Sequence, residues 1–485
     1  MSEVKLEHKV VKGVAWSFLE KILSMVVQMM VSIIVARQLA PTDFGIMAIM
    51  TFFTSVALTI VDSGFSQTLI RKEQPSDSEY RSVLRFNIVS SLVLYVALVA
   101  VAYPLAAFYD SPVIKDIAPV LFLVLPINAL CVVQTVMFTR EFRFALLSKI
   151  VFAASLISGV IAVVMAVMGC GIWALVAQRL LMMGIKAVAF WWIRRWRTSA
   201  KGGVKYLRDM APFSLRLLAT DLISAFYNNV AQLFIGKIYS THSLGFYSQA
   251  QKLKDLPVTS TVQAVQGVTY PALSKLGADN MKFSEGYLKI LRLLSFVVFP
   301  LMLGFVAIAP EMFELLLGDK WMPTVPYFEI LALSGLCYPL AVVAYNVLKV
   351  RSDGRVILRL EIVKRVIMTA VLCYTIPRGV MAVAWGMTLM AGVEFLLNTG
   401  VALRLAKLGA KRFIGALLPS IVVAVAMYFA IILITSHISN MGLGLRLVCE
   451  ILAGGVVYVG LAFILRLRAL KEGVQLLRSM LSKSA

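Results

Sequence analysis

The residues best placed to do chemistry in this chain are charged, amide and phenol side chains within or beside long apolar segments. A charged side chain at the centre of a bilayer costs about 2.5–3.5 kcal/mol, so it normally faces an internal cavity. We therefore expect these residues to line a path for a polar solute and to bind that solute without transforming it. They are Lys21, Gln28, Asp62, Arg179, Arg216, Asp221, Asn228, Asn229, Tyr247, Gln249, Lys252 and Lys254.

Motifs for catalysis, nucleotide binding and metal binding are missing from the sequence. It has no Gly-rich phosphate loop followed by its Lys, no HExxH and no GxSxG. The three histidines are isolated, and the five cysteines stand singly, so that each cysteine is expected to be a small packing residue. We expect no enzyme, no cofactor, no metal site and no direct use of ATP.

Long apolar segments must position the polar side chains. Hydrophobic residues make up 60% of the 485 residues and charged residues 15%, and the mean hydropathy is +0.86. A soluble protein would carry about 25% charged residues. Apolar runs of about 20 residues, enough to cross the hydrocarbon, recur along the chain and include 146–168 and 171–193. This pattern predicts an all-α polytopic membrane protein with about fourteen spans, the first too long for a cleaved signal.

The net charge of +22 is distributed unevenly over the predicted loops. Lys and Arg gather in the terminal segments and in alternate loops, as in the link 194–211, which is expected to lie along the membrane surface. The positive-inside rule then places both termini in the cytoplasm. Nucleic-acid binding is not expected, because the basic loops lack interleaved aromatic residues. The opposite side carries only Arg37, Lys115, Lys237, Lys320, Arg378 and Arg446.

Two stretches about 200 residues apart, 33–47 and 233–247, share the same pattern of helix end, polar link and helix start. Each ends an apolar helix with one cation, Arg37 or Lys237, and restarts after a short polar link at a segment containing Gly45 or Gly245. Two homologous lobes usually hold a substrate path between them. We expect a six-helix lobe at 1–210, a second at 211–411, and an extra helix pair with an amphipathic cytoplasmic tail at 412–485.

Several of these charged residues also have a structural interpretation. Lys21 lies near the cytoplasmic end of its span, where a long side chain can reach water. Arg37 and Lys237 either cap helix carbonyls or contact substrate. Asp255 is expected to form a salt bridge with Lys252 or Lys254.

The three membrane acids Asp62, Asp221 and Glu394 are either ion-coupling sites or structural partners. Lys364 and Arg365, beside Glu361 in a predicted span, are interpreted mainly as ion-paired.

Several motifs, in this order, resemble those of Wzx-type polysaccharide exporters. They are Lys12–Ser17, Ala36–Gly45, Asp62–Phe65, Leu69–Lys72, Leu244–Ala250, Tyr270–Ser274 and Leu317–Trp321. The resemblance covers nearly the whole chain and points to the colanic-acid/lipopolysaccharide exporter branch of the multidrug/oligosaccharidyl-lipid/polysaccharide (MOP) flippase superfamily. It implies two pseudo-symmetric six-helix lobes in a MATE-like V shape. Members of the family commonly have an Asp where this chain has Ala231, so a role for that acid is in doubt here.

The resemblance also implies a function. Such a protein would be a flippase in the bacterial inner membrane, moving undecaprenyl-diphosphate-linked oligosaccharide to the periplasmic leaflet by alternating access. The product would serve lipopolysaccharide, exopolysaccharide or capsule synthesis, with membrane lipid, a glycan polymerase and a chain-length regulator as candidate partners. Lys21, Arg37, Arg179, Arg216, Lys237, Lys252 and Lys254 would then bind the diphosphate, and Gln28, Asn228, Asn229, Tyr247 and Gln249 the sugars.

Two other functions remain open at this point. A cation-coupled drug antiporter of the same superfamily would use Asp62, Asp221 or Glu394 as its coupling acid, although the excess of basic side chains argues against a cationic substrate. A membrane scaffold for a glycan-synthesis complex would need no transport path at all.

Overall fold

The computed structural model describes residue 23 and residues 25–196, 198–276, 279–352, 354–438 and 441–475. Every regular element in these residues is a helix, which confirms the all-α prediction. Lys21 and the predicted tail beyond residue 475 lie outside the described residues.

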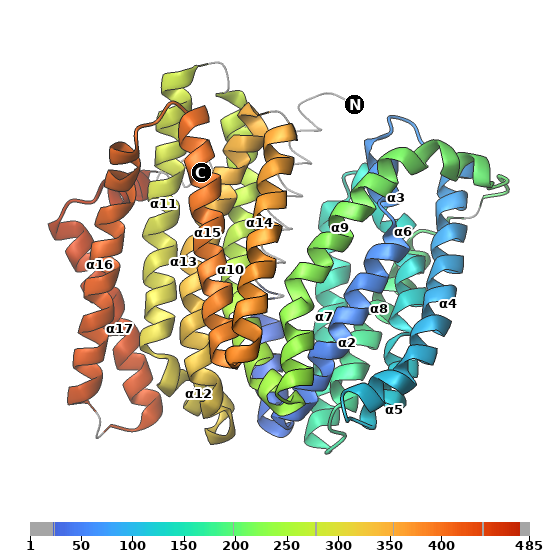
Figure 1. The fold of residues 1–485 in the computed structure, drawn as a ribbon, viewed down its shortest axis with the longest axis horizontal. Coiled ribbons are helices and arrows are strands. Elements are labelled where there is room, and N and C mark those ends of the chain that lie inside the picture. Colours follow the sequence, from blue (N-terminus) through green and yellow to red (C-terminus); the bar gives the residue numbers. More distant parts are fainter. Residues whose placement is uncertain are drawn as a thin grey trace. The chain divides into compact units, whose positions relative to one another are not determined.

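The helices follow one another through short links (Figure 1). After the helical segment Met25–Gln38 come α2 Pro41–Asp62, α3 Phe65–Arg71, α4 Asp77–Phe108, α5 Val113–Leu121, α6 Val124–Arg140, α7 Phe144–Val167, α8 Trp173–Ile193 and α9 Val204–Ile238. The chain continues with α10 Thr241–Lys275, α11 Asn280–Ala307, α12 Ala309–Leu317, α13 Val325–Arg351, α14 Gly354–Thr375, α15 Val380–Leu405, α16 Ala410–His437 and α17 Leu443–Ile464.

Within the described residues, ten helical stretches are long and apolar enough to cross a membrane. The chain is therefore a multi-pass membrane protein, but the predicted count of about fourteen spans is not confirmed. Of the remaining predicted spans, α9, α10 and α14 are long enough to cross yet fall outside the ten because they are more polar. These three helices carry many of the candidate binding residues.

The chain divides into two compact units, Met1–Ser248 and Gln249–Ala485. In the first unit, α2 packs against α9, α4 and α6, and α7 packs against α8. In the second unit, α13 packs against α15 and α11, and α16 packs against α11 and α17. This division reports where residues pack and does not test the proposed repeat boundaries at 210/211 and 411/412, which stay a prediction.

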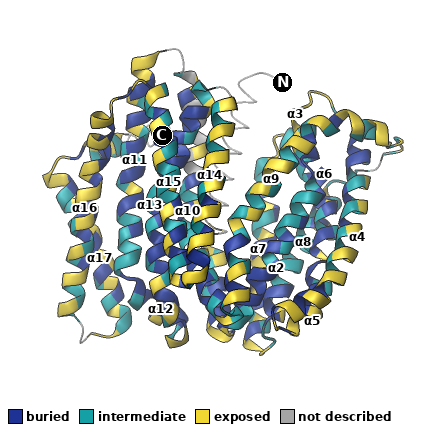
Figure 2. Ribbon diagram, in the orientation of Figure 1, coloured by how far each residue is buried: buried dark blue, intermediate teal, exposed yellow. Residues whose placement is uncertain are grey.

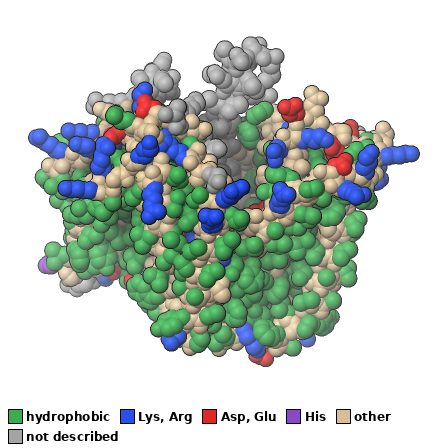
Figure 3. All heavy atoms as spheres, turned by 45° about the horizontal axis from the view of Figure 1, so that its top comes forward, with side chains coloured by type: hydrophobic (Ala, Val, Ile, Leu, Met, Phe, Trp, Pro, Cys, Tyr) green, Lys and Arg blue, Asp and Glu red, His purple; other side chains and the backbone are tan. Residues whose placement is uncertain are grey.

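The hydrophobic residues fall into a buried group and an exposed group. Buried side chains lie along the inner helices of each unit, whereas the outer faces of α16 and α17 expose large apolar residues such as Phe429, Val456 and Phe463 (Figure 2). Figure 3 shows hydrophobic side chains over the middle of the visible face, with Lys and Arg gathered toward one end. An apolar band of this kind is what lipid requires.

The two repeat-related glycines meet in the first unit. A Cβ added to Gly45 of α2 would lie 1.8 Å from the carbonyl oxygen of Thr241, and one added to Gly245 of α10 would lie 1.9 Å from the carbonyl oxygen of Pro41. The contact is reciprocal, since each glycine meets the first residue of the other helix, as a two-fold axis between repeats would produce. Only glycine allows the two backbones to approach so closely.

Candidate functional site

A tight elbow joins α2 to α3 in the first unit. Ser63 and Gly64 both have left-handed backbones, with φ of 48° and 69°. Gly64 also lies against α9, because an added Cβ would come within 2.7 Å of the Ser214 carbonyl oxygen. One turn further on, the hydroxyl groups of Thr68 and Ser214 lie 2.7 Å apart. The motif Asp62–Phe65 is therefore a structural joint that docks on α9.

Two of the three candidate acids, Asp62 and Asp221, interact electrostatically near this elbow. Asp62, the last residue of α2, accepts a hydrogen bond from the hydroxyl group of Ser66. Asp221 of α9 is close enough to interact electrostatically with Asp62, and its side chain is exposed. Two neighbouring carboxylates repel each other, so a cation or a proton between them would be favoured.

The polar residues of α9 do not all share one face. Asp221 and Asn228 are seven residues apart, which is close to two helical turns, and both are exposed. Asn229 is half-buried and donates to the Ala225 carbonyl oxygen at 2.9 Å. Arg216 is also exposed; its backbone carbonyl accepts from the Thr220 hydroxyl group, but no described residue forms a hydrogen bond or ion pair with its guanidinium group. Arg216 is therefore available to an anion, whereas the Asn229 amide is partly occupied.

Arg179 and Gln28 lie in different surroundings in the first unit. Arg179 of α8 is partly buried and donates to the Thr51 hydroxyl oxygen of α2 at 3.3 Å. Gln28 lies on the segment Met25–Gln38 and is exposed. A partly buried guanidinium group with one weak hydrogen bond retains several donors for another acceptor.

The two repeat-related cations lie at helix ends, as predicted. Arg37 is exposed near the end of the segment Met25–Gln38. Lys237 donates to the Phe108 carbonyl oxygen, lies 3.5 Å from an Asp110 carboxylate oxygen, and sits 4.7 Å from the centre of the Phe108 ring. Lys237 therefore caps the C-terminal end of α4, a neighbouring helix, and not only its own. A role in binding substrate stays a prediction for both residues.

The start of α10 mixes buried and exposed candidates. Tyr247 and Gln249 are buried, and the amide nitrogen and oxygen of Gln249 have no hydrogen-bond partner among the described residues. Lys252 is exposed. The ammonium group of Lys254 lies 2.5 Å from the Asp255 carboxylate, which confirms the salt bridge expected for one of the two lysines.

An ion-pair network centred on the buried Lys364 joins α14 to α15 in the second unit. The Lys364 ammonium group lies 2.5 Å from Glu361 and 3.4 Å from Glu394, and only 6% of the Lys364 side chain is exposed. The Tyr345 ring lies 5.4 Å from the same ammonium group. The expected pairing around Glu361 is confirmed, and Glu394 is part of the same network.

The sequence analysis did not detect other charged clusters, because their members are far apart along the chain. Arg446 of α17 pairs with Glu311 of α12 and, at 3.3 Å, with Glu450, whose side chain is fully buried. Arg140 of α6 donates to the carbonyl oxygens of Leu69 and Glu73 and so caps the end of α3. Spacing along one helix could have suggested only the pair Arg446–Glu450.

Comparisons with curated proteins find distant relatives of nearly the same length. The teichuronic acid biosynthesis protein TuaB of Bacillus subtilis (strain 168) is 23% identical over 94% of this chain and 95% of its own length. The succinoglycan biosynthesis transport protein ExoT of Rhizobium meliloti (strain 1021) is 23% identical over 98% of this chain and 97% of its own. The lipopolysaccharide biosynthesis protein WzxC of Escherichia coli (strain K12) is 21% identical over 69% of this chain and 68% of its own.

Solved structures show the same fold. The lipid II flippase MurJ, in an inward closed conformation, matches with a TM-score of 0.69 at 15% identity and covers 94% of this chain and 98% of its own. A MOP superfamily transporter from Pyrococcus furiosus matches with a TM-score of 0.55, covering 82% of this chain and 96% of its own. The model of the family described as polysaccharide biosynthesis protein matches residues 34–326, more than half of the sequence. The chain therefore belongs to the polysaccharide biosynthesis protein family, as a multi-pass membrane protein with a MOP-type helical fold.

Proposed function

We propose that this protein is a flippase that moves a polyprenyl-diphosphate-linked oligosaccharide across the bacterial inner membrane for polysaccharide synthesis. The observation that carries the proposal is the family membership together with a MOP-type fold whose most polar long helices carry cations and amides. Relatives named for polysaccharide biosynthesis and its transport support the same class of substrate. No enzymatic step is part of the proposal.

The cations of α9 and α10 are suited to a diphosphate. Arg216 and Lys252 are both exposed, although each lies in a helix long enough to span the bilayer. Direct contact with hydrocarbon would cost about 2.5–3.5 kcal/mol for each charge, so a water-filled path is the favoured environment. Arginine and lysine form charge-assisted hydrogen bonds to phosphate, and Asn228 and Gln28 offer amides for sugar hydroxyl groups.

Substitution of these cations tests the site. Arg216→Gln and Lys252→Gln should each reduce export about tenfold or more, because a hydrogen bond to a charged group contributes about 1.5–3 kcal/mol. Arg208→Gln is the matched control, since Arg208 is an exposed arginine in the first turns of α9. The readout is accumulation of lipid-linked oligosaccharide in a deletion strain that carries each variant, at equal membrane expression. Wild-type export by both site variants would refute the assignment.

The energy source is the second part of the proposal. A diphosphate carries about two negative charges, and each charge moved through 100 mV is worth about 2.3 kcal/mol, so outward passage gains about 4–5 kcal/mol. The network around Lys364 supports this view, because Glu394 is held there by an ion pair. The test is transport in proteoliposomes at a potassium–valinomycin potential. Rates that ignore the potential but follow a sodium or proton gradient would favour ion coupling.

The competing functions make different predictions. A cation-coupled drug antiporter would protect a hypersensitive strain from toxic cations, whereas the flippase would not. A scaffold would tolerate substitutions of Arg216 and Lys252 but not of its loops. The proposal also places both termini in the cytoplasm. It further includes contacts with a glycan polymerase and a chain-length regulator.

A further inference from the structure

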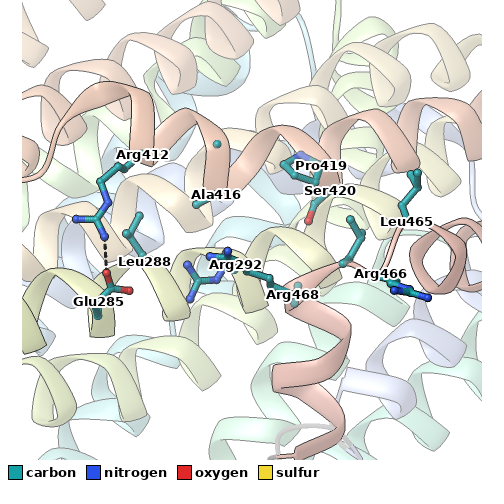
Figure 4. A pocket seen from close by; sticks show the side chains of 13 residues that line it. Glu285, Leu288, Arg292, Arg412, Ala416, Pro419, Ser420, Leu465, Arg466 and Arg468 are labelled. Carbon is teal, nitrogen blue, oxygen red and sulfur yellow. Dashed lines mark hydrogen bonds and ion pairs between the residues drawn. The ribbon is translucent and has the colours of Figure 1, made fainter.

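A basic pocket lies in the second unit where three helices come together near their ends. Its volume is about 480 Å³ (Figure 4). Residues from the first half of α11, the first half of α16 and the segment that follows α17 line it. The residues whose chemistry matters most are Glu285, Arg292, Arg412, Arg466 and Arg468.

The chain reverses at the end of α17 to close this pocket. Arg466 has a left-handed backbone with φ of 50°, and the Leu467 N–H donates to the Ala462 carbonyl oxygen at 3.0 Å. This pattern is a Schellman turn, which ends α17 and allows a second helix to begin at residue 468. That helix is fastened to α11, because two Arg292 nitrogens donate to Glu472 at 2.7 and 3.3 Å.

The pocket has more positive than negative charge. Arg412 pairs with Glu285 at 2.6 Å, and Arg292 pairs with Glu472. Arg466 and Arg468 are exposed, and no described carboxylate lies within ion-pair distance of either. Four arginines therefore face two carboxylates, which leaves an excess of two positive charges. Figure 4 shows the arginines in the order Arg412, Arg292, Arg468 and Arg466 along the pocket.

The pocket combines charged groups with apolar surface. Leu288, Pro419 and Leu465 add apolar surface beside the arginines, and the exposed residues Phe463 and Ile464 continue this surface along α17. The charges lie where α16 begins and α17 ends, which is the level at which a membrane changes from headgroups to acyl chains. Basic pockets between membrane helices at this level suit phosphate headgroups.

We propose that the pocket binds the headgroup of an anionic membrane phospholipid, through its phosphodiester groups. Arg466 and Arg468 are the primary phosphate ligands, because neither is engaged by a carboxylate in the described structure. Arg292 and Glu472 position the helix that begins at residue 468. A headgroup with two phosphates, as in diphosphatidylglycerol, matches the excess of two charges and binds better than phosphatidylglycerol. None of the residues that line the pocket is a candidate transport residue, and the proposal does not depend on the transport function.

The test measures lipid binding to the purified full chain in detergent by native mass spectrometry. The lipids are diphosphatidylglycerol, phosphatidylglycerol and neutral phosphatidylethanolamine. The pocket variant is Arg466→Asn with Arg468→Gln, in which Asn is chosen because it tolerates a left-handed backbone. We expect its affinity for diphosphatidylglycerol to fall about thirty-fold, or about 2 kcal/mol, since each cation near an anionic surface is worth about 1 kcal/mol.

The control removes the same charge elsewhere. Arg355→Gln with Arg359→Gln changes two exposed arginines in the first turns of α14, in the same unit, and should bind within twofold of wild type. Equal losses in both variants, or no loss in the pocket variant, would overturn the proposal. Displacement of bound lipid by millimolar inorganic phosphate would instead indicate a site for a free anion. If the double variant unfolds, Arg468→Gln alone, expected to bind about fivefold more weakly, decides the question.

Discussion

The contact between the two repeat-related glycines can be tested by adding one methyl group to each. Gly45→Ala and Gly245→Ala each place a Cβ 1.8 or 1.9 Å from a backbone carbonyl oxygen. A carbon and an oxygen need about 3.3 Å, so the two helices must separate by about 1.5 Å. Backbone atoms cannot rotate away as a flexible side chain can. We therefore expect a cost at the upper end of the range for overpacking, about 3 kcal/mol.

Part of this cost is offset locally, because alanine is favoured over glycine within a helix by about 1 kcal/mol. The net loss of stability is then about 2 kcal/mol for each substitution. For a folded unit of about 250 residues this corresponds to roughly 4–8 °C in the unfolding temperature. Gly184→Ala and Gly392→Ala are matched controls, because an added Cβ there has no atom within 4 Å. The controls should unfold at or slightly above the wild-type temperature.

The assay monitors thermal unfolding with a thiol reagent that becomes fluorescent when it reacts with an exposed cysteine. Cys131 is buried in the first unit and reports its opening. Because both methyl groups act on one crossing, the double variant should lose less stability than the sum of the singles, by about 1–2 kcal/mol. Single variants that unfold like the Gly184 and Gly392 controls would show that these backbones are not in contact, and the reasoning would fail.

Three further predictions concern charged residues. Lys364→Met removes the ammonium group 3.4 Å from Glu394, while Glu361 keeps Arg365 at 3.7 Å. Because both carboxylates are about one-third exposed, the variant should lose about 1–3 kcal/mol of stability in thermal unfolding, and Glu394→Gln should lose less. Asp279 caps α11, and hydrogen bonds from the N–H groups of Lys282 and Met281 lower its pKa. The contribution of this cap to stability should therefore be present above about pH 4 and be lost as the pH falls through the lowered pKa of Asp279. Asp279→Ala should abolish this loss of stability in acid, which thermal unfolding at several pH values would show. Cysteines introduced at Arg37 and Lys237, in a cysteine-free background, should react with an impermeant thiol reagent outside spheroplasts, and protection of both would contradict the proposed topology.

Helix positions were predictable from the sequence where apolar runs end at clear signals. The predicted spans 146–168 and 171–193 correspond to α7 and α8, which are separated by the left-handed Gly169 and Gly171. In the segment 194–211, which was predicted to lie along the membrane surface, residues 204–211 are the first turns of α9. Its position relative to the membrane stays a prediction. Pro212 lies early in α9, and the helix continues through it.

Partners across helices were not predictable. Spacing indicated the pair Lys364–Glu361 because the two residues are one helical turn apart, but it could not show that Glu394 joins them from α15. The same limit applies to Arg292 and Glu472, which meet although 180 residues separate them. The candidate binding residues were recognised by their cost in lipid, which depends on residue type alone. Their exposure, as for Arg216 against Gln249, depends on packing that one sequence does not reveal.

Two ion pairs join the last part of the chain to the rest of the second unit, and they limit how this part could be lost by truncation. Glu311 has 7% of its side chain exposed and is paired with Arg446, and Arg292 has 15% exposed and is paired with Glu472. A gene shortened before residue 412 would leave both groups without their counter-charge inside the remaining protein. Each would then need a second, compensating change. Loss of residues 412–485 in a single step would therefore be disfavoured, because two charges would lose their partners together.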